Sequence, residues 1–181
     1  MNRNNTMSRR KMLFGALKGY ARNADVPEPK RDNPGQDAGT LAKANAAFDA
    51  GDHARAVEGY RRFLEAEPGN EDARLRLGRA LYAQGQYVQA RVEFERVLRT
   101  RKEDNQALAH LGLSLLRTGK TDKAVAVWKR YFDPTNVLVQ REINLQLGLL
   151  ETGDAPDPDA MALAVEMVLA RAEHLAGTDG A

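Results

Sequence analysis

Residues 71–104 decide the fold, and they read EDARLRLGRALYAQGQYVQARVEFERVLRTRKED. In the first half of this stretch, Leu77, Ala80 and Leu81 lie three and four residues apart, a spacing that predicts an amphipathic helix. Gly85 follows as a turn residue that ends this helix. The second half has the same spacing of apolar residues and predicts another helix. Because the turn between them has only two or three residues, the two helices are expected to be antiparallel.

The same pattern recurs along the chain at a period of 34 residues. The columns at this spacing are Gly51, Gly85 and Gly119; Ala56, Ala90 and Ala124; Tyr60, Phe94 and Trp128; and Ala44, Gly78 and Gly112. Several columns in one register indicate a repeat architecture. Small residues such as Gly78 and Ala90 let two helix backbones approach closely, while Leu77, Leu81 and Phe94 fill the space beside the crossing.

This pattern resembles the tetratricopeptide repeat family, whose unit reads W-x2-L-G-x2-Y, then A-x3-F, then P. The matching positions are Leu77, Gly78, Ala90 and Phe94 in the second copy and Leu111, Gly112, Ala124 and Trp128 in the third. The leading Trp is absent from every copy, and the closing Pro stands in register only at Pro68. The resemblance implies an all-α, right-handed solenoid of antiparallel helix pairs, with about seven or eight helices and a concave side lined by first helices.

The repeat divides the chain into five segments. The predicted divisions are 1–24, a basic segment that is a short amphipathic helix or disordered; 25–36, a Pro/Gly linker; 37–136, three repeats at about 37–70, 71–104 and 105–138; 137–176, a degenerate fourth repeat with capping helices; and 177–181, a frayed tail. Asp157 followed by Pro158 is typical of the start of a helix. We expect this last, strongly apolar helix to cover the exposed end of the stack.

The composition excludes several kinds of chemistry. The 181 residues include 27 Lys and Arg, 25 Asp and Glu, and no Cys. Disulfides, thiolate metal sites and a thiol nucleophile are therefore excluded. The net charge of +2 conceals an asymmetry, because residues 1–24 hold six basic residues and no acidic ones. The remaining 21 basic and 25 acidic residues give residues 25–181 a net charge of −4.

No group of residues has the spacing of a catalytic or metal site. His53, His110 and His174 are far apart in the sequence, and none has an evident partner to orient it for acid–base catalysis. The acidic residues around Asp157 lack the spacing of a calcium-binding loop, and no phosphate-binding loop occurs. We therefore expect a protein that is not an enzyme and that uses neither a cofactor nor a metal.

The first helices predict a groove for a partner protein. If Leu77 and Leu81 are buried, a neighbouring row of residues on the same helix faces the concave side. The equivalent rows in the other copies lie 34 residues earlier and later in the sequence. The predicted groove residues are Leu41, Asn45, Phe48, Leu75, Arg76, Arg79, Tyr82, His110, Leu113, Leu116 and Arg117. Arginine binds carboxylates with two hydrogen bonds, so this groove favours a segment with apolar anchors and acidic residues. Alternatively, the arginines only keep the helix face soluble.

The N-terminal segment has several interpretations. Residues 8–14 read SRRKMLF, which resembles the twin-arginine export motif S-R-R-x-F-L-K. Because Lys18 interrupts the apolar run that follows, cleaved export is the less favoured interpretation. The segment could instead lie on an anionic membrane surface, dock on an acidic partner, fold back on the acidic repeats of its own chain, or stay disordered. The predicted docking residues are Arg9, Arg10, Lys11, Leu13, Phe14, Leu17 and Lys18.

These observations favour a non-catalytic scaffold or adaptor that holds a peptide or protein segment in the groove. The alternative is an accessory or assembly factor for a larger complex, peripheral to a membrane or associated with export, and positioned by the basic N-terminal segment. Nucleic acid is not an expected partner, because one short basic run lacks stacking aromatic residues. We expect a cytoplasmic location. If the protein is the membrane-peripheral accessory factor, we expect it at the cytoplasmic face of the membrane.

Overall fold

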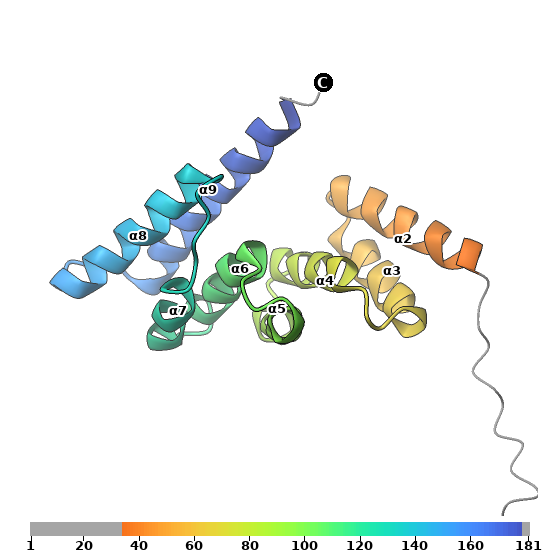
Figure 1. Ribbon diagram of the computed structural model, residues 1–181, viewed down its shortest axis with the longest axis horizontal. Coiled ribbons are helices and arrows are strands. Elements are labelled where there is room, and N and C mark those ends of the chain that lie inside the picture. Colours follow the sequence, from red (N-terminus) through yellow and green to blue (C-terminus); the bar gives the residue numbers. More distant parts are fainter. Residues whose placement is uncertain (1–33, 179–181) are drawn as a thin grey trace, which may run out of the picture. The chain divides into compact units, whose positions relative to one another are not determined.

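The computed structural model describes residues 34–178, which form helices joined by short connections (Figure 1). The helices are α2 (Pro34–Asp49), α3 (His53–Ala66), α4 (Glu71–Ala83), α5 (Tyr87–Thr100), α6 (Asn105–Leu116), α7 (Thr121–Trp128), α8 (Val137–Thr152) and α9 (Pro158–Thr178). No strand occurs in this part of the chain, so the fold is all-α, as predicted. α2 begins at Pro34, inside the segment that the sequence assigns to a linker, because proline suits the first turn of a helix.

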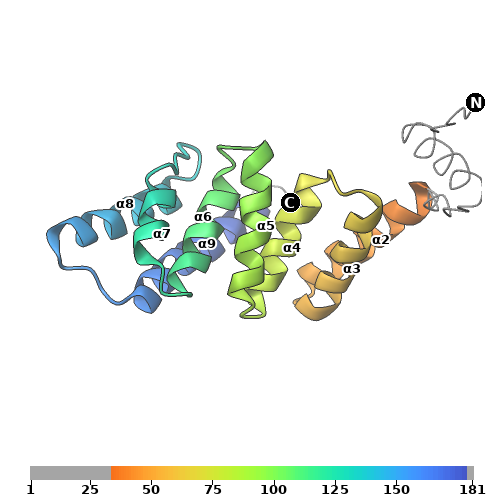
Figure 2. The same cartoon turned by 90° about the horizontal axis from the view of Figure 1, so that it is seen from below.

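Helices adjacent in the sequence pack as pairs, α2 with α3, α4 with α5, and α6 with α7 (Figures 1 and 2). The turns within these pairs use the predicted glycine column. Gly51, Gly85 and Gly119 have φ angles of 77°, 73° and 68°, in the left-handed region where a residue with a Cβ is strained. Gly153, between α8 and α9, has a φ angle of 82°. The glycine register therefore extends to a fourth helix pair.

The small and the aromatic columns meet inside the pairs. Gly112 faces the ring of Trp128, and a Cβ on this glycine would come within 1.9 Å of Trp128 Nε1. Gly78 faces Phe94 in the same way, since its Cβ would lie 2.6 Å from Phe94 Cε1. Both aromatic side chains are buried, and Trp128 Nε1 donates a hydrogen bond to the Ala109 carbonyl. In α4/α5 and α6/α7, the repeat columns are thus the contacts that close the helix pair.

Side-chain caps fix where several helices begin. Asn70 and Asp104, which are one repeat apart, accept hydrogen bonds of 2.9 Å from the backbone three residues on and start α4 and α6. Asn136 caps α8 in the same manner. Asp157 accepts bonds from the backbone of the first turn of α9, directly before Pro158, as the sequence predicts.

The regular stack ends at α7. α3 packs on α4 and α5 packs on α6, but α7 is short and has only slight contact with α8. After α8, the chain turns back and α9 packs on both α8 and α6 (Figures 1 and 2). The sequence places this helix over the end of the stack, whereas in the structure it lies along α6. The physical reason is that leucine and alanine side chains cover most of the circumference of α6, so this helix needs a further neighbour.

Candidate functional site

A cavity of about 190 Å³ lies between α2, α4, α6 and α9. Its lining residues are Phe48, Arg79, Tyr82, Ala83, His110, Leu113, Glu166, Leu169, Ala170 and Glu173. The first helices of three successive repeats thus contribute residues from the predicted groove to one cavity. The opposite wall comes from α9, which the sequence does not place there. We call this space the α9 cleft.

The burial of α6 explains why α9 lies in this position. Every residue from Ala107 to Leu116 is buried, because α4, α5, α7 and α9 surround the helix. Leu113 and Leu116 were expected to form part of an open groove floor, but they are only 1% and 2% exposed. Leu75, in α4, is also buried. These three leucines are core residues, since leaving them in water would forfeit the free energy of apolar burial.

Charged side chains tie α9 to the ends of α4 and α6. Arg117 Nη2 lies 2.9 Å from both carboxylate oxygens of Glu166, and Arg117 Nη1 lies 3.0 Å from Asp159. The Tyr82 hydroxyl donates a hydrogen bond to the same Glu166 carboxylate. Burial raises the pKa of Tyr82 far above its ordinary range, and the hydrogen bond to Glu166 acts in the same direction. The hydroxyl therefore keeps its proton and remains a donor.

Arg79 links the two walls of the α9 cleft. Its guanidinium carbon lies 5.2 Å from the centroid of the Phe48 ring, within the range of a cation–π contact. Its Nη2 pairs with the Glu173 carboxylate of α9. Arg76, three residues earlier, has a side chain that is 42% exposed and that lies 3.9 Å from the exposed carboxylate of Asp49. Arg79 is therefore engaged by α9, whereas Arg76 presents its charge largely to solvent.

His110 lines the cleft but is almost fully buried. Its Nδ1 lies 2.9 Å from the Gln106 carbonyl oxygen, and its ring centroid lies 5.5 Å from that of Phe94. Burial, together with the positive charge of Arg79, lowers the pKa of His110 to about 4. The imidazole is therefore neutral at pH 7 and packs as an aromatic core residue.

The other predicted groove residues contribute to packing in the first repeat. Asn45 Oδ1 accepts a hydrogen bond of 2.8 Å from the buried Tyr60 hydroxyl. The ring of Phe48 meets the rings of His53 and Tyr60 edge-on. Leu41 is half-buried against the core. Asn45 thus satisfies a buried donor and is not a free group in the groove.

None of the α9 residues is among those that the sequence predicts for the groove. Two signals in the sequence point to them. The segment Asn105–Leu116 has leucine and alanine side chains over most of its circumference, which requires one more neighbour than a regular repeat supplies. In addition, Asp159, Glu166 and Glu173 are spaced seven residues apart, so they share one face of the last helix.

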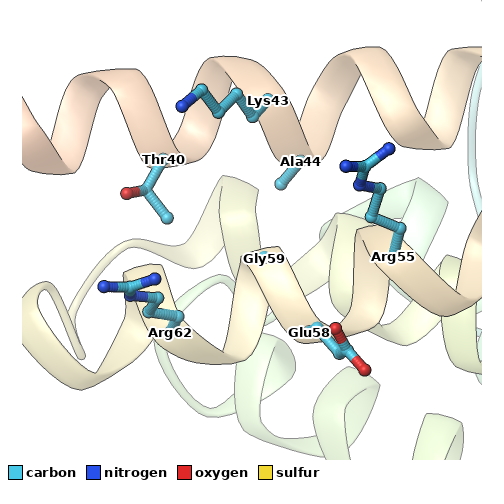
Figure 3. A pocket seen from close by; sticks show the side chains of 7 residues that line it. All are labelled: Thr40, Lys43, Ala44, Arg55, Glu58, Gly59 and Arg62. Carbon is cyan, nitrogen blue, oxygen red and sulfur yellow. The ribbon is translucent and has the colours of Figure 1, made fainter.

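A second cavity, of about 290 Å³, lies between α2 and α3 (Figure 3). Its lining residues are Thr40, Lys43, Ala44, Arg55, Glu58, Gly59 and Arg62. Figure 3 shows Arg55 and Arg62 rising from α3 toward α2, whereas Glu58 points away. The side chains of Lys43, Arg55 and Arg62 are exposed, so water and salt screen their charges. The α9 cleft, where charges are partly buried, is therefore the stronger candidate site.

Some functional predictions concern features outside this cleft. Within residues 34–178, no three His, Asp or Glu side chains are grouped as metal ligands. No helix in that range is both long and apolar enough to cross a membrane. The predicted docking residues between Arg9 and Lys18 lie outside the described residues, so their roles stay predictions.

Comparison with known families supports the repeat assignment. The sequence profile described as tetratricopeptide repeat matches residues 47–113. This range runs from the end of α2 through α3, α4 and α5 and into α6. A comparison with curated proteins gave no match. The profile match, the helix pairs and the glycine turns agree with one another. The helix pairs of α2 to α7 therefore form a helical-repeat stack, in which residues 47–113 match the tetratricopeptide repeat profile.

Proposed function

We propose that this protein is a non-catalytic scaffold that binds a segment of a partner protein in the α9 cleft. Tetratricopeptide repeats are protein-interaction modules, and stacked repeats present extended binding surfaces. The observation that carries the proposal is the cavity itself, which combines the half-buried aromatic side chains of Phe48 and Tyr82 with the guanidinium of Arg79. Such a combination suits apolar anchors flanked by acidic residues.

The chemistry of the cleft supports this type of ligand. Phe48 and Tyr82 are only partly buried, so each has apolar surface that a partner side chain can cover. Arg76 lies on α4 one turn before the cleft-lining Arg79, where it interacts with the Tyr60 hydroxyl and lies 3.9 Å from Asp49. Its side chain is 42% exposed, so an acidic residue of the partner can pair with it. The cleft therefore offers both an apolar contact and a charge of defined sign.

The alternative function, an accessory factor positioned at a membrane or export complex, depends on residues 1–24. These residues lie outside the described range, and no observation on α2 to α9 favours that function. It remains a prediction from the sequence, together with the cytoplasmic location.

A photo-crosslinking amino acid at Ala83 tests the scaffold proposal in the native cell. Ala83 is exposed and lines the cleft, so a bound partner segment lies within reach. Ala126, an exposed alanine on α7, is the matched control position. We expect one defined crosslinked species from position 83 and none from position 126. We also expect this species to be lost when Arg76→Glu reverses the exposed charge.

Two results would contradict the proposal. One is crosslinking from position 126 but not from position 83. The other is crosslinking from position 83 that Arg76→Glu leaves unchanged. The thermal unfolding curve of each variant, followed by circular dichroism, shows whether the repeats are intact.

A further inference from the structure

The acidic residues of α9 meet the repeats at a regular spacing. Asp159, Glu166 and Glu173 are seven residues apart, about two helical turns, so their side chains lie on one face. Arg117 pairs with Asp159 and Glu166, and Arg79 pairs with Glu173. The repeats thus bind α9 as a helix that carries an acidic stripe.

The two halves of α9 are held differently. In the first half, Met161, Ala162 and Val165 are at most 1% exposed. In the second half, which we define as residues 166–175, no side chain is fully buried. Its ion pair with Arg79 involves Glu173, whose side chain is 50% exposed, and an exposed pair of this kind contributes little to stability. Glu166 anchors the start of this half to Arg117 and Tyr82, and the residues after Glu166 are held weakly compared with the first half.

The second half of α9 also fits the cleft incompletely. It presents Leu169 and the small Ala170 to the cavity of about 190 Å³. This cavity opens to solvent, so the apolar surface of these two side chains that faces it is in contact with water. A helix with a larger apolar side chain in place of Ala170 can fill this space while keeping the acidic stripe.

From these contacts we propose that residues 166–175 occupy the binding site of a helix from a partner protein. The partner helix displaces these residues when it binds. The partner helix is amphipathic, carries carboxylates seven residues apart that pair with Arg79 and Arg117, and has a large apolar residue between them. This inference rests on the proposed function, because it names the ligand class of the same cleft. α9 then keeps the cleft closed until such a helix is present.

The test uses the full chain and a synthetic probe. In the opened variant, Glu166→Lys and Glu173→Lys turn two attractive contacts with Arg117 and Arg79 into repulsive ones. The probe is a fluorescent peptide with the sequence of residues 158–178 and the change Ala170→Leu, and its binding is followed by anisotropy. Because an attached helix competes at a high effective concentration, we expect the opened variant to bind the probe at least about tenfold more tightly than the unmodified chain.

Three controls define what is recognised. A probe that also carries Glu166→Gln and Glu173→Gln should bind the opened variant about tenfold more weakly, since it lacks the acidic stripe. Adding Arg117→Glu to the opened variant should abolish binding of the original probe. Glu65→Lys with Glu67→Lys makes the same change in net charge at exposed positions near the end of α3, and it should leave probe binding as weak as in the unmodified chain.

Folding is monitored so that every result is decisive. If the opened variant does not give a cooperative unfolding curve, Glu173→Lys alone is used, because it leaves the buried first half of α9 untouched. Amide hydrogen exchange on the unmodified chain should be faster in residues 166–175 than in α4 and α6.

The inference is overturned if the probe binds the opened and unmodified chains equally, or if the glutamine probe binds as tightly as the acidic one. Dimers of the opened variant that exclude the probe would assign the cleft to a second copy of this chain and would also overturn it. Probe binding that requires Arg117 and the acidic residues of the probe upholds the inference even if position 83 captures no partner in cells. If position 83 captures a partner but the opened variant does not bind the probe, the proposed function is supported and the proposed role of α9 is overturned.

Discussion

The Arg117 guanidinium, at the end of α6, holds the Glu166 carboxylate of α9 with Nη2 placed 2.9 Å from each of its two oxygens. The Arg117 and Glu166 side chains are only 20% and 26% exposed, so water competes weakly for the pair. The Tyr82 hydroxyl donates to the same carboxylate and connects α4 to it. This pair therefore joins the last stacked repeat to the helix that closes the cleft, and it fixes the register of α9 along α6.

The Arg117–Glu166 pair should contribute measurably to stability. In a double-mutant cycle of Arg117→Ala and Glu166→Ala, we expect a coupling free energy of about 1–2 kcal/mol, measured by urea unfolding. The Arg91–Glu95 pair on α5 is the control, because its atoms are 3.7 Å apart and more exposed. Its coupling should be below about 0.5 kcal/mol. Equal coupling in the two cycles would show that the partial burial of Arg117 and Glu166 has no energetic consequence.

The glycine column inside the helix pairs should not tolerate a methyl group. A Cβ at Gly112 meets the ring of Trp128 at 1.9 Å, and this buried ring has no room to move. We expect Gly112→Ala to lower the free energy of unfolding by about 2–3 kcal/mol. Gly148→Ala is the control, because Gly148 is also helical but has no atom within 4 Å of the added Cβ. It should raise stability by about 0.5–1 kcal/mol, and a loss of similar size at both positions would disprove the close-approach explanation.

The stack could be predicted from the sequence because it depends on contacts within one repeat or between adjacent repeats. Gly85 ends α4, Ala90 and Phe94 pack against Gly78, and the same rules apply one repeat further on. Periodicity reports such local contacts directly. The position of α9 depends instead on the pairing of Glu166 with Arg117, 49 residues earlier. No repeat column records a contact of this kind.

The candidate site was predictable in part for the same reason. The register brings Phe48, Arg79 and Tyr82 to one cavity, as expected of equivalent positions in successive first helices. It does not show that Leu113 and Leu116 are covered, because amphipathic patterns identify an apolar face but not its neighbour. The carboxylates opposite the arginines belong to α9, outside the repeat.

Asn45 should stabilise the fold because its side chain accepts a hydrogen bond from the Tyr60 hydroxyl. Tyr60 is fully buried, and its hydroxyl donates to Asn45 Oδ1 at 2.8 Å. Asn45→Ala leaves this donor without that acceptor, so we expect a loss of about 1–2 kcal/mol in the free energy of unfolding. In a Tyr60→Phe background, where there is no hydroxyl to satisfy, the same substitution should cost about 0.5 kcal/mol or less. An equal cost in both backgrounds would assign Asn45 a role other than this hydrogen bond.

His110 should make the protein less stable as the pH falls below about 6.5. Burial and the charge of Arg79 lower the pKa of His110 to about 4 in the folded protein, whereas the unfolded chain has a value near 6.5. Between these values the unfolded state binds more protons, so stability is fully present above about pH 6.5 and is lost progressively toward pH 4. From pH 7 to pH 5, this group should cost the protein about 2 kcal/mol.

The variant His110→Gln separates this effect from the titration of carboxylates, which both proteins share. Urea unfolding at pH 7 and pH 5 should show that the unmodified protein loses about 2 kcal/mol more than the variant over this interval. His174→Gln is the control, because it removes a histidine that is exposed on α9 and leaves the core unchanged. Parallel stability curves for the unmodified protein and His110→Gln would show that the buried imidazole is not held neutral. In that case, His110 would not be a neutral ring packed between Tyr82 and Phe94 at the edge of the α9 cleft.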